Sequence, residues 1–213
     1  MIILIGSKKG GVGKSTLATN ISALLASQGK DVVLVDADRQ STSANWVHDR
    51  NETNKAQLTC ARQYDNIKKT ITDFNNRYEF VIVDCQGRDS IELRTGLLAA
   101  DICLIPCRPS QADLDTIPLM TNVINTAKEI NENLKAYCVL TMSPTNPNIT
   151  EIADSKEYLA RHPSVELLDT IISDRKIYRD AMSAGYGVTE MDNDKAKNEI
   201  ENLLKEILNG KNS

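Results

Sequence analysis

A glycine-rich segment directly after an apolar run constrains this chain more than any other feature. Residues 6 to 16 read Gly-Ser-Lys-Lys-Gly-Gly-Val-Gly-Lys-Ser-Thr, and the run before them, residues 1–5, has the length and content of a buried parallel strand. A strand that leads through a glycine-rich turn into a helix is the context of a phosphate-binding loop, because backbone N–H groups can close around phosphate oxygens there. In this pattern Lys14 reaches the β- and γ-phosphates, and the Ser15 hydroxyl ligates Mg²⁺. The sequence therefore predicts a nucleotide-dependent function.

Length and composition favour one α/β domain over residues 1–213. The net charge of −4 argues against an overall basic nucleic-acid-binding protein and leaves a local basic face open. Five cysteines without a Cys-x-x-Cys pair, and two histidines, give little support for a zinc site. We expect reduced core thiols of a cytoplasmic protein, and we interpret residues 1–5 as a core strand rather than a signal peptide. No apolar run approaches the ~20 residues of a membrane-spanning helix.

Apolar runs alternate with helical patterns and predict a mostly parallel, doubly wound sheet with helices on both faces. Expected strands span 1–5, 32–36, 57–61, 79–84, 101–106, 136–142 and 166–172. The first helix follows the glycine-rich loop and ends before Gly29; further helices are expected near 42–50, 64–76, 88–99, 111–131, 149–161, 175–184 and 193–208. Pro118 should kink or interrupt one of them, and Asn148 should cap another. Ligands of such sheets lie beyond the carboxyl ends of the strands.

Acidic residues follow two of the expected strands at that end. Asp36 and Asp38 come directly after the second strand, and Asp84 ends the apolar run over 79–84. Carboxylates near bound phosphates can hold Mg²⁺ and orient an attacking water. The alternative is a pair of turn-forming aspartates that cap the next helix. A phosphate-binding loop earlier in the same chain favours the metal and water roles.

The loop departs from the plain G-x-x-x-x-G-K-S/T pattern, because Lys8 stands where the first glycine should fall and Lys9 adds a second lysine. The arrangement Lys-Gly-Gly-x-Gly-Lys-Ser resembles the deviant Walker A loop of the ParA/MinD ATPases. This resemblance implies a P-loop NTPase fold and a dimer in which Lys9 crosses the interface to the partner's nucleotide. It implies that ATP is bound by Lys9, Gly10, Gly11, Val12, Gly13, Lys14, Ser15 and Thr16.

The acidic segments resemble the switch regions of the same family. By this resemblance Asp38 activates the hydrolytic water, Asp36 supports the metal and the loop, and Asp84 holds Mg²⁺ together with Ser15. Arg39 replaces a proline of the family's first switch, and Cys85-Gln86 replaces prolines of the second. Gly87 supplies the backbone freedom that a γ-phosphate sensor loop needs.

Two later segments resemble the small ParF-like plasmid-partition ATPases. Pro106-x-x-Pro-Ser-x-x-Asp113 resembles a segment of the nucleotide-dependent dimer face, although a rigid loop and helix cap explain these residues equally well. Residues 172–190 resemble the family's C-terminal region, which implies that Ser173 and Asp174 lie near the adenine. The basic residues there are candidates for DNA contact, and a solvated helix face is the alternative: Arg175, Lys176 and Arg179.

The resemblance extends from residue 1 to about residue 208 and implies a Mg²⁺-dependent ATP hydrolase with catalytic residues Lys9, Lys14 and Asp38. It further implies a homodimer on ATP binding, non-specific DNA binding that associates the protein with the nucleoid, and positioning of a plasmid or other cargo. A centromere-binding protein of the ParB/ParG type, or a cargo adaptor, would stimulate hydrolysis. Site-specific operator binding is not expected, because no N-terminal helix-turn-helix extension precedes the loop.

Two alternatives share this fold. A MinD-like protein would bind membranes through its last helix, but the polar side of that helix is mixed to acidic, so we expect core packing and no membrane binding. A metabolic or metallocluster-assembly relative would need substrate residues or paired cysteines at the dimer face, and the sequence shows no such pair. Lys8 leaves two possibilities open: it strengthens phosphate binding, or it faces solvent without effect.

Overall fold

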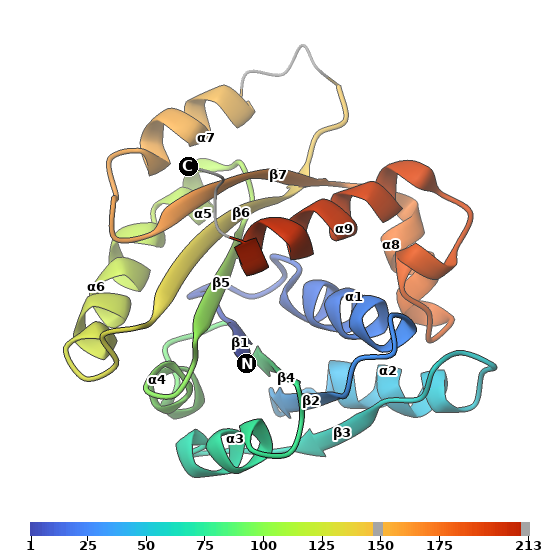
Figure 1. Cartoon of the computed structure of the whole chain (residues 1–213). Helices are drawn as coiled ribbons and strands as arrows, with labels where there is room; N and C mark the ends of the chain where they lie inside the picture. The colour runs from blue at the N-terminus through green and yellow to red at the C-terminus, as the bar shows by residue number, and fades with distance from the viewer. Residues whose placement is uncertain (147–150, 210–213) are drawn as a thin grey trace.

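The structure is a computed structural model that describes residues 1–146 and 151–209. Within these residues seven strands form one sheet in the order β3-β2-β4-β1-β5-β6-β7, and every pairing between neighbours is parallel (Figure 1). The strands are β1 (Ile2–Ile5), β2 (Val32–Ala37), β3 (Thr59–Arg62), β4 (Phe80–Cys85), β5 (Ile102–Cys107), β6 (Lys135–Ser143) and β7 (Glu166–Ser173). The predicted strand order along the chain is confirmed.

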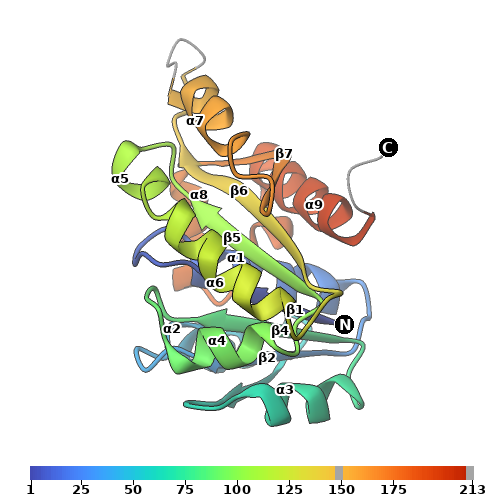
Figure 2. The ribbon, with the colours of Figure 1, turned by 90° about the vertical axis from the view of Figure 1, so that its left-hand side faces the viewer.

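Helices cover both faces of the sheet, as predicted (Figures 1 and 2). One face carries α1 (Lys14–Ser27), α2 (Thr42–Asn51), α8 (Lys176–Ser183) and α9 (Asp194–Asn209), with the short helix η1 (Val188–Glu190). The other face carries α3 (Lys68–Asn75), α4 (Ile91–Leu97), α5 (Gln111–Leu114), α6 (Ile117–Lys128) and α7 (Glu151–Leu159). The fold is the doubly wound α/β architecture of a P-loop NTPase.

The core consists of two layers, one on each side of the sheet. Side chains of β1 alternate between them: Ile3 and Ile5 join the layer under α1 and α9, while Ile2 and Leu4 join the layer under α4 and α6. None of these four residues is more than 2% exposed. Burial on both faces explains why the strands read as continuous apolar runs.

The last helix packs on the sheet, which confirms the expectation of core packing. Its apolar side chains are buried, apart from Leu208, which is 37% exposed. The carboxylate of Glu206 also accepts hydrogen bonds from the backbone N–H groups of Asp169 (2.6 Å) and Thr170 (3.0 Å) on β7. These bonds satisfy donors at the sheet edge that a further strand could otherwise use. Among the described residues, no helix combines the length and apolar content that crossing a membrane requires.

Two helices differ from their predicted bounds for local reasons. The helix expected over 111–131 is divided, because α5 ends at Leu114 and α6 begins at Ile117. Pro118 lacks an N–H and cannot continue α5, but it fits the first turn of α6. The helix expected from residue 64 begins only at Lys68, after Asp65 adopts a left-handed φ of 66°. The predicted cap at Asn148 lies outside the described residues.

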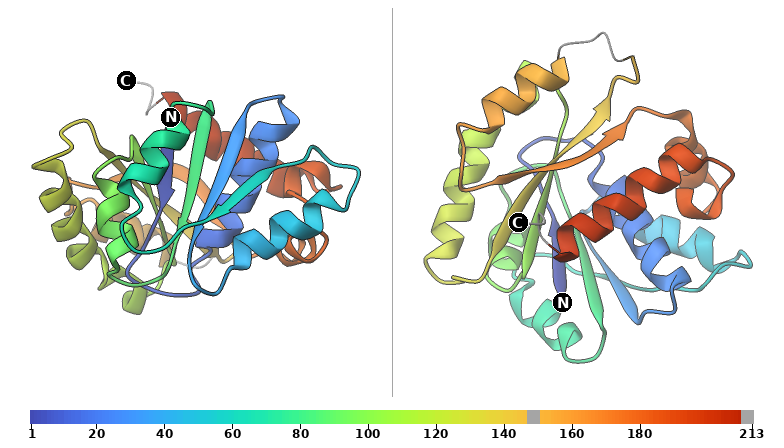
Figure 3. Two further views of the ribbon diagram at one scale, coloured as in Figure 1. Left: turned by 90° about the horizontal axis from the view of Figure 1, so that it is seen from below. Right: turned by 45° about the horizontal axis from the view of Figure 1, so that its top comes forward.

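The path of the chain places the carboxyl end of β1 at a change of direction. From β1 the chain builds β2 and β3 toward one edge, returns with β4, and then builds β5, β6 and β7 toward the other edge (Figure 3). Ligands of doubly wound sheets bind at such a switch point. The glycine-rich loop, residues 6–13, leaves β1 there.

Candidate nucleotide-binding site

The glycine-rich loop has the shape of an anion cradle. Gly11 and Gly13 have φ values of 72° and 94°, a left-handed conformation that other residues rarely adopt. Thr141 on β6 donates a hydrogen bond from its hydroxyl to the Val12 carbonyl at 2.8 Å, which holds the loop from a second strand. The first turn of α1 contains no acidic residue. Its free N–H groups therefore face a site that suits phosphate.

Lys14 is the first residue of α1, and its side chain folds back onto the glycine-rich loop. Its side chain is buried, and its Nζ donates to the Lys9 carbonyl (3.1 Å) and the Ser7 hydroxyl (3.4 Å). Burial lowers the pKa of Lys14, while Asp84 and Asp38 act in the opposite direction. The ammonium is held by weak neutral acceptors, so a phosphate oxygen can replace them.

Asp84 is a buried carboxylate with one uncommitted oxygen. Its Oδ2 accepts a hydrogen bond from the Ser43 hydroxyl at 2.6 Å, whereas Oδ1 is buried and has no hydrogen-bond partner in the described part of the chain. Burial raises the pKa of Asp84 to about 6, against the opposing effect of the Ser43 and Ser15 hydroxyls. An unpaired carboxylate oxygen near a serine hydroxyl is the donor set that Mg²⁺ prefers. The residues present therefore fit a Mg²⁺ ion held by Ser15 and Asp84.

Asp36 and Asp38 shape the loop after β2. Asp36 is paired in register with Asp84 across β2 and β4. Its two oxygens accept backbone N–H bonds from Asp38 (3.0 Å) and Ala44 (2.8 Å), and burial raises its pKa. Asp38 is partly exposed, and among the described residues its carboxylate accepts only the N–H of Gln40, at 3.0 Å. Asp36 thus supports the loop directly, and Asp38 has an oxygen available for water.

The second lysine of the loop is paired within its own chain. Lys9 Nζ lies 2.7 Å from Asp113 Oδ1, and the two side chains are 40% and 4% exposed. The Ser110 hydroxyl donates to Asp113 Oδ2 at 2.8 Å, so the Pro-x-x-Pro-Ser-x-x-Asp segment positions this carboxylate. The structure thus brings this segment into contact with the glycine-rich loop.

Lys8 binds the loop that follows β4. Its Nζ lies 2.6 Å from Asp89 Oδ2, and its side chain is 13% exposed. Gly87 packs on the glycine-rich loop so closely that a Cβ at this position would come within 2.5 Å of the Lys9 carbonyl. Close approach, rather than a positive φ, is what requires glycine here. Lys8 is therefore paired with an acid of a second loop instead of facing solvent, and its effect on phosphate binding stays a prediction.

The other departures from the family pattern also have local partners. The Arg39 guanidinium stacks over the Tyr64 ring at 4.9 Å and lies 3.5 Å from Asp65. Gln86 donates to the Glu92 carboxylate at 3.4 Å. The contacts of Arg39 connect the loops after β2 and β3, and the bond of Gln86 connects the loop after β4 to α4, so both positions have polar partners.

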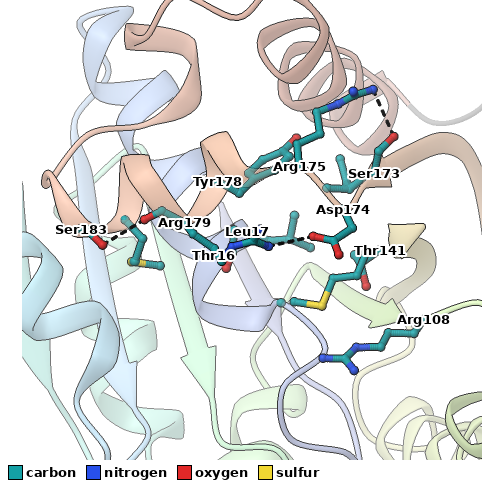
Figure 4. A pocket seen from close by; sticks show the side chains of 14 residues that line it. Thr16, Leu17, Arg108, Thr141, Ser173, Asp174, Arg175, Tyr178, Arg179 and Ser183 are labelled. Carbon is teal, nitrogen blue, oxygen red and sulfur yellow. Dashed lines mark hydrogen bonds and ion pairs between the residues drawn. The ribbon is translucent and has the colours of Figure 1, made fainter. Parts of the chain in front are cut away.

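A cavity of about 590 Å³ opens beside the glycine-rich loop (Figure 4). Its size is in the usual range for small-molecule sites. Ser173 and Asp174 line it, together with residues of the loop and α1, Gly13, Thr16 and Leu17. Sequence reasoning missed several lining residues that come from three other segments: Arg108, Thr141, Met142, Tyr178 and Met182. The ends of β5 and β6 carry the first three, so inspecting every strand end would have found them.

The basic cluster predicted at the start of α8 is neutralised. Arg175 pairs with Glu199 at 2.8 Å, Lys176 with Asp180 at 2.9 Å, and Arg179 with Asp174 at 2.9 Å. Each basic side chain of the predicted patch therefore has an acidic partner: Glu199 from α9, Asp180 from α8 itself and Asp174 from the segment between β7 and α8.

A glycine loop between a strand and a helix, a buried lysine within it and a buried acid at the end of a neighbouring strand define a P-loop nucleotide-binding protein. The family described as CobQ/CobB/MinD/ParA nucleotide binding domain matches residues 3–212, and the chain belongs to this family.

Known proteins of this family resemble the chain over nearly its whole length. The Maintenance of carboxysome distribution protein A of Halothiobacillus neapolitanus is 29% identical over 210 residues, which cover 97% of this chain and 95% of the relative. The apo structure of McdA from Cyanothece superposes with a TM-score of 0.77 at 16% identity and covers 97% and 98% of the two chains. A plasmid partition protein of Borrelia burgdorferi bound to AMPPNP gives 0.73 at 20% identity and covers 98% of each chain. At these identities the two structures establish the shared fold.

Proposed function

We propose that this protein is a Mg²⁺-dependent ATPase that dimerises on ATP binding and positions an intracellular cargo. The observation that carries the proposal is the glycine-rich loop with two lysines, Lys9 and Lys14, beside the buried and half-paired Asp84. A loop of this kind binds nucleoside triphosphate phosphates, and a second lysine is the feature of the deviant Walker A type. The ligands named for related structures, AMPPNP and an ATP analogue with magnesium, support the choice of nucleotide.

The residues divide the work of phosphoryl transfer. Backbone N–H groups of residues 9–16 and the Lys14 ammonium hold the phosphates, and Ser173 and Asp174 border the nucleoside end of the cavity. Ser15 and Asp84 would hold Mg²⁺, which would neutralise charge on the phosphates, and Asp36 fixes the adjacent loop. Asp38 orients the attacking water. Lys9 leaves Asp113, crosses to the nucleotide of a second copy and supplies positive charge to the transition state, as an arginine finger does in other enzymes.

Cargo positioning requires a cycle between two states. In the proposed cycle the ATP-bound dimer associates with the nucleoid through non-specific DNA contacts in the cytoplasm. A centromere-binding or adaptor protein then stimulates ATP hydrolysis, and the dimer is released from the DNA. The names of relatives, which concern carboxysome distribution and plasmid or chromosome partition, support this class of role.

The proposal is tested by three measurements on the purified chain. ATP turnover should require Mg²⁺. A gel shift with random-sequence duplex DNA at ~0.1 M salt should occur with ATP and not with ADP, and should weaken as salt rises. Sedimentation with anionic vesicles should leave the protein in solution. Vesicle binding with ATP would favour a MinD-like cycle, and an ATP-bound dimer without DNA affinity would contradict the partition function.

A further inference from the structure

Arg108 reaches the glycine-rich loop from a neighbouring strand. It is the first residue after β5, which pairs with β1, and one of its terminal nitrogens donates a hydrogen bond to the Gly11 carbonyl. Figure 4 shows its guanidinium extended toward the loop, beneath Thr141. The backbone of the loop and this side chain are close neighbours, because a Cβ at Gly11 would lie 3.5 Å from Arg108 Nη2.

The guanidinium has more donors than this contact uses. Its Nε is buried and has no hydrogen-bond partner, and no carboxylate pairs with it in residues 1–146 and 151–209. The other two arginines of the cavity differ in this respect, since Arg175 pairs with Glu199 and Arg179 pairs with Asp174. A guanidinium presents five donors in a planar fork that suits phosphate oxygens. Arg108 is thus a cation at the loop whose charge no acid balances.

The position of Arg108 decides which phosphates it can reach. It lines the cavity together with Gly13 and Thr16 and with Ser173 and Asp174, which the proposed function assigns to the nucleoside. Lys9 and Lys14 do not line this cavity: Lys9 pairs with Asp113, and the Lys14 ammonium donates to the Ser7 hydroxyl and the Lys9 carbonyl. The arginine therefore faces the part of a bound nucleotide between the nucleoside and the γ-phosphate.

We propose that Arg108 is a nucleotide-binding residue that contacts the α- and β-phosphates within its own chain. The inference rests on the proposed function, in that a nucleotide must occupy this cavity. It assigns a different task to each cation: Lys9 acts on the γ-phosphate of a second copy, and Arg108 holds the diphosphate common to ATP and ADP. A contact made equally in substrate and transition state strengthens binding without raising the turnover rate.

Binding of ADP and of ATP to three variants tests this assignment. Arg108→Ala should weaken both affinities by about tenfold or more and by the same factor, because a charged hydrogen bond to phosphate is lost. Arg108→Lys should recover part of the loss, since it keeps the charge. Arg108→Gln should recover little, although its amide can still donate to the Gly11 carbonyl. Arg161→Ala is the matched control, because it removes an arginine outside the cavity that is already paired with an acid, Glu157; it should change the affinities by less than about threefold.

Titration calorimetry at ~0.1 M salt, with melting temperatures as a check on folding, separates the outcomes. Loss of ATP affinity with ADP affinity unchanged would overturn the assignment in favour of a γ-phosphate or cross-dimer contact. Full recovery by glutamine would show that Arg108 only supports the loop. Unchanged affinities in all three variants would refute a phosphate contact while leaving the proposed ATPase intact, whereas a wild-type chain that binds neither nucleotide would refute the proposed function itself.

Discussion

The ammonium of Lys9 and the carboxylate of Asp113 form an ion pair of 2.7 Å within one chain. Asp113 is held by the Ser110 hydroxyl and is almost fully buried, so the pair fixes Lys9 against its own subunit. If Lys9 serves the nucleotide of a second copy, this contact must break when the dimer forms. Breaking the pair then costs free energy, which new contacts at the nucleotide-dependent interface must offset.

Asp113→Asn should therefore favour the dimer. Asparagine keeps an acceptor for Ser110 but removes the charge that holds Lys9. A partly exposed ion pair contributes about 0.5–1 kcal/mol, and each of the two subunits loses one, so the dimerisation constant with ATP should increase about five- to thirtyfold. Analytical ultracentrifugation over a range of protein concentrations measures this constant. A weaker dimer in Asp113→Asn would mean that Asp113 belongs to the interface itself.

Lys8→Gln should leave ATP affinity within about twofold of wild type, because the ammonium is occupied by Asp89 and not directed at phosphate. Lys14→Ala is the matched comparison and should abolish measurable binding, since it removes the cation inside the loop. Fluorescent-nucleotide titration reports both values. A strong loss of affinity in Lys8→Gln would assign phosphate binding to Lys8 after all.

Asp38→Ala should bind ATP normally and hydrolyse it at least about a hundredfold more slowly, the usual size of a lost general-base or water-orienting contribution. Among the described contacts, the substitution removes the hydrogen bond from the Gln40 N–H. The two hydrogen bonds by which Asp36 holds the loop stay in place. The variant should accumulate as an ATP-bound dimer. Normal turnover in single-turnover kinetics would rule out Asp38 as the residue that orients water.

Glu190→Gln should destabilise the fold strongly. Arg50 and Glu190 form a two-bond ion pair at 2.8 Å, with side chains 0% and 8% exposed, which ties α2 to η1. Removing one partner leaves a buried charge and costs about 3–5 kcal/mol of unfolding free energy. Asp174→Asn, in the exposed pair with Arg179, is the control and should cost less than about 1 kcal/mol. Urea unfolding measures both, and equal effects would contradict the special role of the buried pair.

Much of the fold could be predicted because the buried strands are visible in the sequence as apolar runs. Strands buried on both faces leave continuous Val, Ile and Leu segments, and their alternation with helices fixes the layers. Helix bounds were less predictable, because the start of α3 depends on the backbone at Asp65, which binds Glu92 from a distant helix.

The parts of the site that lie in one short sequence segment could be predicted. The glycine-rich loop and the acids after β2 and β4 are local patterns, and the structure brings them together. The partners of charged residues were not predictable, since Asp113 and Asp89 meet Lys9 and Lys8 only through the fold. The same holds for Glu199, which comes from α9 to pair with Arg175 and so removes the apparent basic patch.

The central claim is that Lys9 makes ATP binding and dimerisation one event. Sedimentation velocity of wild type and Lys9→Ala, each with ADP and with ATP in Mg²⁺, tests it most directly. We predict that wild type is a monomer with ADP and a dimer with ATP. Lys9→Ala should bind ADP normally and remain a monomer with both nucleotides. An ATP-dependent dimer in Lys9→Ala as strong as that of wild type would contradict the account.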